Sequence, residues 1–244
     1  MSSVGLLYVG AVLCVNGLVQ IGVVRPRGAI VLNFIVGTMQ LVFPTILLTG
    51  ANGDPGAILA ASGLYLFGIT YLWVGAIGAF HLPADGFGWF SLYVAVTAAV
   101  FGGAAVVLQS DPVAAAMWWL WAALWFLFFL LDALGRRRLR VPTGWFAIFC
   151  GVGTCTLPAL LQLLGLYSPS PIAGVALGLA GAGVLAIALL LSRRYPGSRH
   201  LAAGVAPDAG AGTAEGAEAI GADVAAGSGG PGSPRIDARI VMRG

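Results

Sequence analysis

The chain has 244 residues, of which 59% are hydrophobic and only 9% are charged, and its formal net charge is +3. A soluble globular domain carries about 25% charged residues, so this composition excludes a soluble enzyme and predicts an all-α integral membrane protein. All 12 basic residues are arginines in short connecting segments or the C-terminal tail, which indicates membrane orientation rather than nucleic-acid binding.

Seven apolar segments are each long enough to cross a bilayer, which takes about 20 residues in a helix. Short segments rich in glycine, proline and aspartate separate them and favour turns. We expect six spans to form one bundle over residues 1–167 and a seventh transmembrane helix over 168–192. In chain order the expected spans are residues 3–22, 28–49, 57–80, 87–108, 113–134, 143–166 and 172–192.

Residues 193–244 differ from the rest of the chain. They are rich in glycine, alanine, proline and serine, carry scattered charges, and show no apolar periodicity. Such a composition cannot bury a hydrophobic core, so we predict a disordered tail.

The arginines alternate along the chain between connecting segments. They lie in the first and fifth loops and after the seventh span, whereas the second, fourth and sixth loops have none. Because short cytoplasmic loops retain basic residues, the first, third and fifth loops and the tail are predicted to be cytoplasmic. The N-terminus is then outside. The arginines that carry this argument are Arg25, Arg27, Arg136, Arg137, Arg138, Arg140, Arg193, Arg194 and Arg199.

Ionisable residues are missing from the middle of every span. Only Asp132 comes close, at the cytoplasmic end of the fifth segment and one turn before Arg136. Proton relays, ion pumps and carriers of charged substrates place such groups at membrane depth, so a path here would suit a neutral solute. Cys14, Cys150 and Cys155 are read as packing residues. With no metal cluster and no acid–base pair, we expect no cofactor and no catalysis.

Tryptophans run unusually deep into the fifth segment. Trp118, Trp121 and Trp125 fall within about 60° of each other on a helical wheel, whereas Trp119 points elsewhere. An interfacial aromatic belt does not explain Trp125, which lies near mid-bilayer. Two interpretations remain open: packing against lipid, or the wall of a narrow passage for a flat amide. A second stripe lies on one face of the first segment and consists of Leu6, Val9, Leu13 and Asn16.

Six sequence blocks resemble, in the same order, the AmiS/UreI family of bacterial urea channels and short-chain amide transporters. The resemblance covers about residues 4–166 and is closer to the amide-transporter branch. The blocks are "LLYVGAVLCVNGL" at 6–18, "VLNFIVG" at 31–37, "FGITYLW" at 67–73, "GWFSLYVAVTA" at 88–98, "LWFLFFLL" at 124–131 and "GWFAIFCGVGTCTLPALL" at 144–161.

The resemblance implies six helices around a pore in each protomer and a homo-oligomer, hexameric in the urea channel. It implies passage of a small neutral solute, urea or a short aliphatic amide, across the lipid bilayer of the bacterial plasma membrane. Carried over by position, the pore-lining residues are Leu6, Val9, Leu13, Asn16, Trp73, Trp118, Trp121 and Trp125.

The chain departs from the acid-gated urea channel at several positions. Cys150 stands where that channel has a glutamate in its sixth helix, and Thr156 replaces a tryptophan. The histidines used for acid gating lie in outer loops, but the histidines here, His81 and His200, both fall on the predicted cytoplasmic side. We therefore expect a path that acid does not gate.

The alternative function and the role of the seventh segment remain open. The alternative function is a membrane scaffold that assembles a partner without transporting anything; loss of the deep tryptophans would leave such a protein intact. Gly174 and Gly178 in the seventh segment have GxxxG spacing, which could pack against a neighbouring helix.

Overall fold

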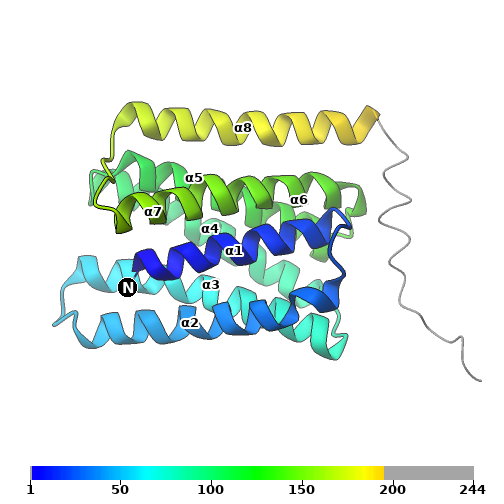
Figure 1. Ribbon diagram of the computed structural model, residues 1–244, viewed down its shortest axis with the longest axis horizontal. Coiled ribbons are helices and arrows are strands. Elements are labelled where there is room, and N and C mark those ends of the chain that lie inside the picture. Colours follow the sequence, from blue (N-terminus) through cyan, green and yellow to red (C-terminus); the bar gives the residue numbers. More distant parts are fainter. Residues whose placement is uncertain (1, 195–244) are drawn as a thin grey trace, which may run out of the picture. The chain divides into compact units, whose positions relative to one another are not determined.

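The protein is an all-α membrane protein, as its composition predicts. The computed structural model describes residues 2–194, and all regular elements in that range are helical (Figure 1). Seven of the helices in this range are long and apolar enough to cross a membrane. The expectation of a disordered tail concerns residues that lie almost entirely outside the described range.

Each expected span coincides with a helix, with short differences at the ends, where helices commonly fray. The fifth and sixth spans contain wider π-helical turns, a feature frequent at functional sites. The elements are α1 (Ser2–Gln20), η1 (Pro26–Ala29), α2 (Ile30–Thr49), α3 (Pro55–Phe80), α4 (Asp85–Val107), α5 (Pro112–Phe128), the π segment η2 (Phe129–Ala133), η3 (Arg137–Leu139), α6 (Arg140–Phe149), the π segment η4 (Cys150–Thr156), α7 (Leu157–Leu163) and α8 (Pro171–Arg194).

Three helices begin with a capping side chain followed by proline. Asp54, Asp111 and Ser170 each accept a hydrogen bond from a backbone N–H in the first turn, at 2.7–3.1 Å. These caps satisfy N–H groups that have no partner inside the helix, and proline suits the next position because it has no N–H. The two aspartates of the arginine-free loops therefore serve as helix caps.

The first six spans pack in a ring around an interior that contains Phe67, Trp121 and Trp125. α2 packs against α3, α4 against α5, and α1 against the sixth span formed by α6, η4 and α7. α8 lies on the outside of this ring, against α5 and α6 (Figure 1). This arrangement leaves α1, α3 and α5 facing a common interior.

Glycines bring α1 and the sixth span into close contact. A Cβ at Gly10 would lie 2.7 Å from the carbonyl oxygen of Gly151, and a Cβ at Gly17 would lie 2.7 Å from that of Gly144. The reverse substitutions are equally crowded, at 2.8 Å in both cases. The two helices run antiparallel, so the earlier glycine of one meets the later glycine of the other. Such close backbone approach is typical of helix packing in membranes.

The predicted Gly174–Gly178 pair is only half correct. A Cβ at Gly174 would lie 2.5 Å from the carbonyl oxygen of Pro112, but at Gly178 it would meet nothing within 4 Å. The second contact is made by Gly181, against Leu120 and Phe149. Around the helix, Gly181 returns to within about 20° of Gly174, whereas Gly178 lies about 40° to the other side, where an added Cβ meets nothing within 4 Å.

Candidate solute pathway

Two neighbouring cavities lie inside the bundle, one toward the end that carries the arginine-rich loops, where η1, α2 and η2 join its lining, and one deeper between α1, α3, α4 and α5. The wider one, here called the inner vestibule, has a volume of about 160 Å³. The other, here called the narrow cavity, has about 30 Å³. Both are lined by Asn16, Val74, Phe87 and Phe128, so the two cavities adjoin each other.

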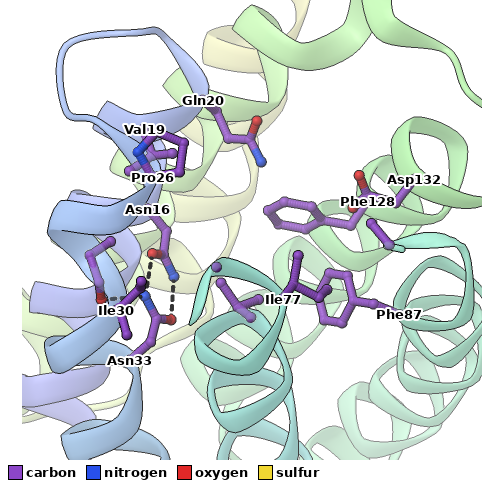
Figure 2. A pocket seen from close by; sticks show the side chains of 14 residues that line it. Asn16, Val19, Gln20, Pro26, Ile30, Asn33, Ile77, Phe87, Phe128 and Asp132 are labelled. Carbon is purple, nitrogen blue, oxygen red and sulfur yellow. Dashed lines mark hydrogen bonds between the residues drawn. The ribbon is translucent and has the colours of Figure 1, made fainter. Parts of the chain in front are cut away.

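Polar groups gather on one wall of the inner vestibule (Figure 2). Asn16 and Asn33 form a reciprocal pair in which each side-chain amide donates to the oxygen of the other, at 2.9 and 2.8 Å. Asn33 also donates to the carbonyl of Ala29. Gln20 lies nearby and accepts a hydrogen bond from Arg140 at 3.1 Å. Asp132 lies across the vestibule beside Phe128 (Figure 2).

The narrow cavity has mostly apolar and aromatic walls. Its lining comes from one face of α3 together with inward residues of α1, α4 and α5. At about 30 Å³ it could hold only a couple of water molecules, so a larger solute would have to displace side chains. The lining residues are Leu13, Asn16, Phe67, Thr70, Tyr71, Val74, Phe87, Trp121, Leu124, Trp125 and Phe128.

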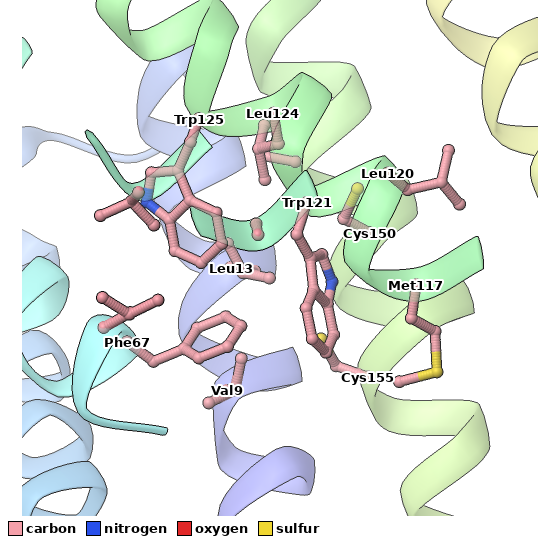
Figure 3. Packing of buried hydrophobic residues seen from close by; sticks show 14 of the residues in the cluster. Val9, Leu13, Phe67, Met117, Leu120, Trp121, Leu124, Trp125, Cys150 and Cys155 are labelled. Carbon is pink, nitrogen blue, oxygen red and sulfur yellow. The ribbon is translucent and has the colours of Figure 1, made fainter. Parts of the chain in front are cut away.

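The deep tryptophans form part of this wall. Trp121 and Trp125 are 4% and 5% exposed, whereas Trp119 is 51% exposed. Both inward rings pack on Phe67, with ring centroids 4.9 Å apart in each case. The helical spacing predicted this division among the tryptophans of α5, and Figure 3 shows Trp121 and Trp125 on the side that Phe67 and Leu13 also approach.

The two inward indoles differ in their hydrogen bonds. The N–H of Trp121 donates to the hydroxyl of Thr154 at 2.7 Å, so it is already occupied. Trp125 makes no such bond with any residue between 2 and 194, and neither does the hydroxyl of Tyr71. Trp125 and Tyr71 therefore offer hydrogen-bonding groups to a solute in the narrow cavity.

Leu6, Val9 and Trp118 lie on the other side of the narrow cavity, toward the N-terminal end of α1. Val9 is buried, Leu6 packs against the same core, and Trp118 packs on Phe101 and Trp121 with ring centroids 4.9 Å apart. These side chains line neither cavity.

Trp73, to which the family resemblance assigns a pore-lining role, lines neither cavity in the structure. Its ring stacks on Phe90 at a centroid distance of 5.5 Å. The inward face of α3 carries Phe67, Thr70, Tyr71 and Val74, at helical spacings of three and four. Trp73 is roughly 110° away from the middle of that face, so it packs between α3 and α4.

The pore-lining set expected from the sequence leaves out Phe67, and the polar residues Asn33, Tyr71 and Thr154 could be read either as contacts between helices or as the lining of a wet path. The face of α3 was detectable, because Phe67, Thr70, Tyr71 and Val74 recur at i, i+3, i+4 and i+7. The partners Asn33 and Thr154 carried no such signal, because a wheel does not show which neighbouring helix a polar residue meets.

Comparison with known proteins identifies the family. The family model described as "AmiS/UreI family transporter" matches residues 1–166. This chain belongs to the AmiS/UreI family. α8 begins after the matched region ends, so the family model does not include it.

The family relatives include both amide and urea proteins. A protein of Rhodococcus erythropolis with the provisional name transporter protein AmiS2 is 51% identical over 189 residues, covering 78% of this chain and 91% of its own. A protein of Mycolicibacterium smegmatis provisionally named as an amidate substrates transporter is 43% identical, covering 83% and 92%. The acid-activated urea channel of Helicobacter pylori is 30% identical, covering 65% and 95%.

The fold is shared with solved structures of this urea channel. The crystal structure matches with a TM-score of 0.61 at 29% identity, and the closed-state cryo-EM structure with 0.63 at 27%. Each match covers 69% of this chain and all of the urea channel chain. α8 is therefore beyond what the urea channel needs for its own fold.

Proposed function

We propose that this protein lets urea or short aliphatic amides cross the bacterial inner membrane through a path inside each protomer. The observation that carries this proposal is the narrow cavity between Phe67, Tyr71, Trp121 and Trp125, which adjoins the inner vestibule. The names of two relatives, an amidate substrates transporter and a urea channel, support the same solute class.

The chemistry of the walls suits a small planar amide. Aromatic rings pack against a flat molecule, the Trp125 N–H can donate to its carbonyl oxygen, and the Tyr71 hydroxyl can accept from its NH₂ group. In the inner vestibule, the Asn16–Asn33 pair and Asp132 can replace the hydrogen bonds that the solute made with water. The narrow cavity is largely apolar, so it favours an amide that carries one short alkyl group.

Ions would cross this path poorly. The narrow cavity has no charged side chain among its described lining, and Asp132 is the carboxylate that lines the vestibule. An ion in an apolar site without a partner loses its hydration at a cost of several kcal/mol. The proposal therefore describes binding and passage of a neutral solute, without catalysis.

Orientation and assembly are part of the proposal. The loops with Arg27 and His81 lie at one end of the bundle, where Arg27 and His81 are 3.0 Å apart. With the basic loops inside, the inner vestibule opens to the cytoplasm and the N-terminus is outside. Similarity to the urea channel further supports a homo-oligomer, which we propose to be a hexamer with one path per protomer.

Stopped-flow uptake into proteoliposomes tests the proposal. We expect the wild-type protein to accelerate uptake of acetamide and urea, with little effect on glycerol and none on sodium or acetate. Tyr71→Phe and Trp125→Phe should each slow uptake, because each removes one hydrogen-bonding group and keeps an aromatic ring. Uptake equal to that of protein-free vesicles, in a correctly assembled preparation, would favour the scaffold alternative.

A further inference from the structure

α8 occupies the outer groove between α5 and the sixth span. α5 and α6 each pack against α8 more extensively than against each other. The exposed residues of α8, among them Val175, Leu179 and Ile187, are apolar and suit lipid contact. Without α8, the groove between α5 and α6 would be open to lipid at this point.

The contact at Gly181 lies directly behind the narrow cavity. A Cβ at this position would meet both Cδ atoms of Leu120, and the ring of Phe149 at 3.0 Å. Leu120 precedes Trp121, and Figure 3 shows it pointing away from the Trp121 ring. Phe149 precedes Cys150, where the π segment η4 begins. The contact thus involves the residue before Trp121 in α5 and the residue before the π segment η4, which holds Thr154, the acceptor of the Trp121 N–H.

The outer end of α8 is attached to α5 independently. Tyr167, just before α8, donates to the carboxylate of Asp111 at 2.8 Å, and Asp111 caps α5. Burial, and then the hydrogen bond with Asp111, raise the pKa of Tyr167 above its ordinary range, so the phenol keeps its proton. One turn into α8, Gly174 packs on the carbonyl of Pro112.

We infer that α8 is a positioning element that, through Gly181, holds α5 and the sixth span together and so keeps Trp121 in place in the narrow cavity. This inference rests on the proposed function and adds to it a role for the helix beyond the region that the family model matches. Gly181 lets α8 lie close against Leu120 and Phe149. A side chain at this position would push Leu120 and Phe149 apart and so displace α5 relative to the sixth span. The width of the narrow cavity then depends on this contact.

The chain offers matched controls on the same helix. Gly178 and Gly183 have no atom within 4 Å of an added Cβ, so leucine at either position should only extend the lipid-facing surface. Gly181→Leu introduces the same residue into the contact. We therefore compare Gly181→Leu with Gly178→Leu and Gly183→Leu in full-length protein.

The measured quantity is the ratio of acetamide to glycerol uptake in proteoliposomes. We expect Gly181→Leu to lower this ratio several-fold, because separating α5 from α6 loosens the narrow cavity, while the two controls match the wild type. Gly181→Ala should shift the ratio in the same direction. Combining Gly181→Ala with Leu120→Ala should restore the ratio, because it removes the side chain that the new methyl group meets.

The outcomes separate this inference from the proposed function. If Gly181→Leu fails to assemble, the alanine pair decides the question. A Gly181 variant with the ratio of the Gly178 control, or an alanine pair without restoration, would overturn the role of α8 but leave the solute path intact. A wild-type protein without any uptake would overturn the proposed function, and this inference with it.

Discussion

The indole N–H of Trp121 and the hydroxyl of Thr154 are joined by a 2.7 Å hydrogen bond between α5 and the π segment η4. The Thr154 hydroxyl in turn donates to the carbonyl of Cys150, one turn earlier in the sixth span. Trp121 therefore has its one polar group turned to a protein partner. It offers the narrow cavity only the apolar surface of its ring, held at a defined angle.

Replacing Thr154 should test this relationship. Thr154→Val keeps the shape of the side chain but leaves the buried indole N–H without an acceptor, which costs about 1–3 kcal/mol. We expect a lower thermal unfolding temperature in detergent and altered solute selectivity. Thr154→Ser keeps the hydroxyl and should behave like the wild type; equal effects of the two substitutions would argue against the hydrogen bond.

Removing Trp125 should widen the path. Trp125→Ala deletes an aromatic wall of the narrow cavity, so we expect glycerol uptake to rise relative to urea uptake in proteoliposomes. Trp145→Ala is the matched control, because Trp145 is 51% exposed on the outside of the bundle while Trp125 is 5% exposed. Unchanged selectivity in the Trp125 variant would move the solute path elsewhere.

A glycine-to-alanine substitution should destabilise the protein at a close contact between α1 and the sixth span, but not at an open position in α4. Gly17→Ala places a methyl group 2.7 Å from the carbonyl of Gly144, and we expect overpacking to cost about 1–3 kcal/mol. Gly103→Ala, in α4, meets nothing within 4 Å and should be neutral or stabilising by about 0.5–1 kcal/mol. Thermal unfolding in detergent measures both, and a harmless Gly17→Ala would contradict the close contact.

Single cysteines can test the orientation. A cysteine at Ser168, between α7 and α8, should react with a membrane-impermeant maleimide in intact cells. A cysteine at Leu82, between α3 and α4, should react only after permeabilisation. The native Cys14, Cys150 and Cys155 lie within the spans and give the background. The reverse pattern would invert the proposed topology.

Uptake should depend little on external pH between about 5 and 8. A gate that opens in this range ordinarily uses histidine, and the arginine-free loops contain none. Their carboxylates, Asp54 and Asp111, cap helices. Because its pKa is raised, the Tyr167 phenol keeps its proton, and so keeps its hydrogen bond to Asp111, at every pH up to the ordinary tyrosine pKa of about 10. The bond is lost only when the pH rises above the raised pKa of Tyr167.

The measurement is acetamide or urea uptake with internal pH held constant while external pH is stepped. Constant rates from about pH 5 to 8 are expected. A several-fold rise on external acidification would contradict this prediction and would implicate one of the two capping aspartates. Asp54→Asn and Asp111→Asn would then identify which one, because asparagine can still cap a helix but cannot titrate.

Much of the fold was open to prediction from local patterns. Apolar runs of sufficient length marked all seven spans, because a membrane leaves backbone groups no hydrogen-bonding partners except those inside a helix. Spacing along α5 separated Trp121 and Trp125 from Trp119, because residues three or four apart share a helix face. The Asp–Pro pairs at 54–55 and 111–112 lie in segments that the sequence predicts as turns, and the structure adds that both aspartates cap helices.

Other features depend on how the helices face one another. Helical spacing orders residues around their own axis, but it does not say which side of that axis faces which neighbour. The rotation of α3 decides that Tyr71, and not Trp73, reaches the narrow cavity. The packing of α8 likewise selects Gly181 over Gly178. Only the folded bundle brings Thr154 to Trp121, 33 residues away in sequence, because the π segment and the antiparallel packing together set that distance.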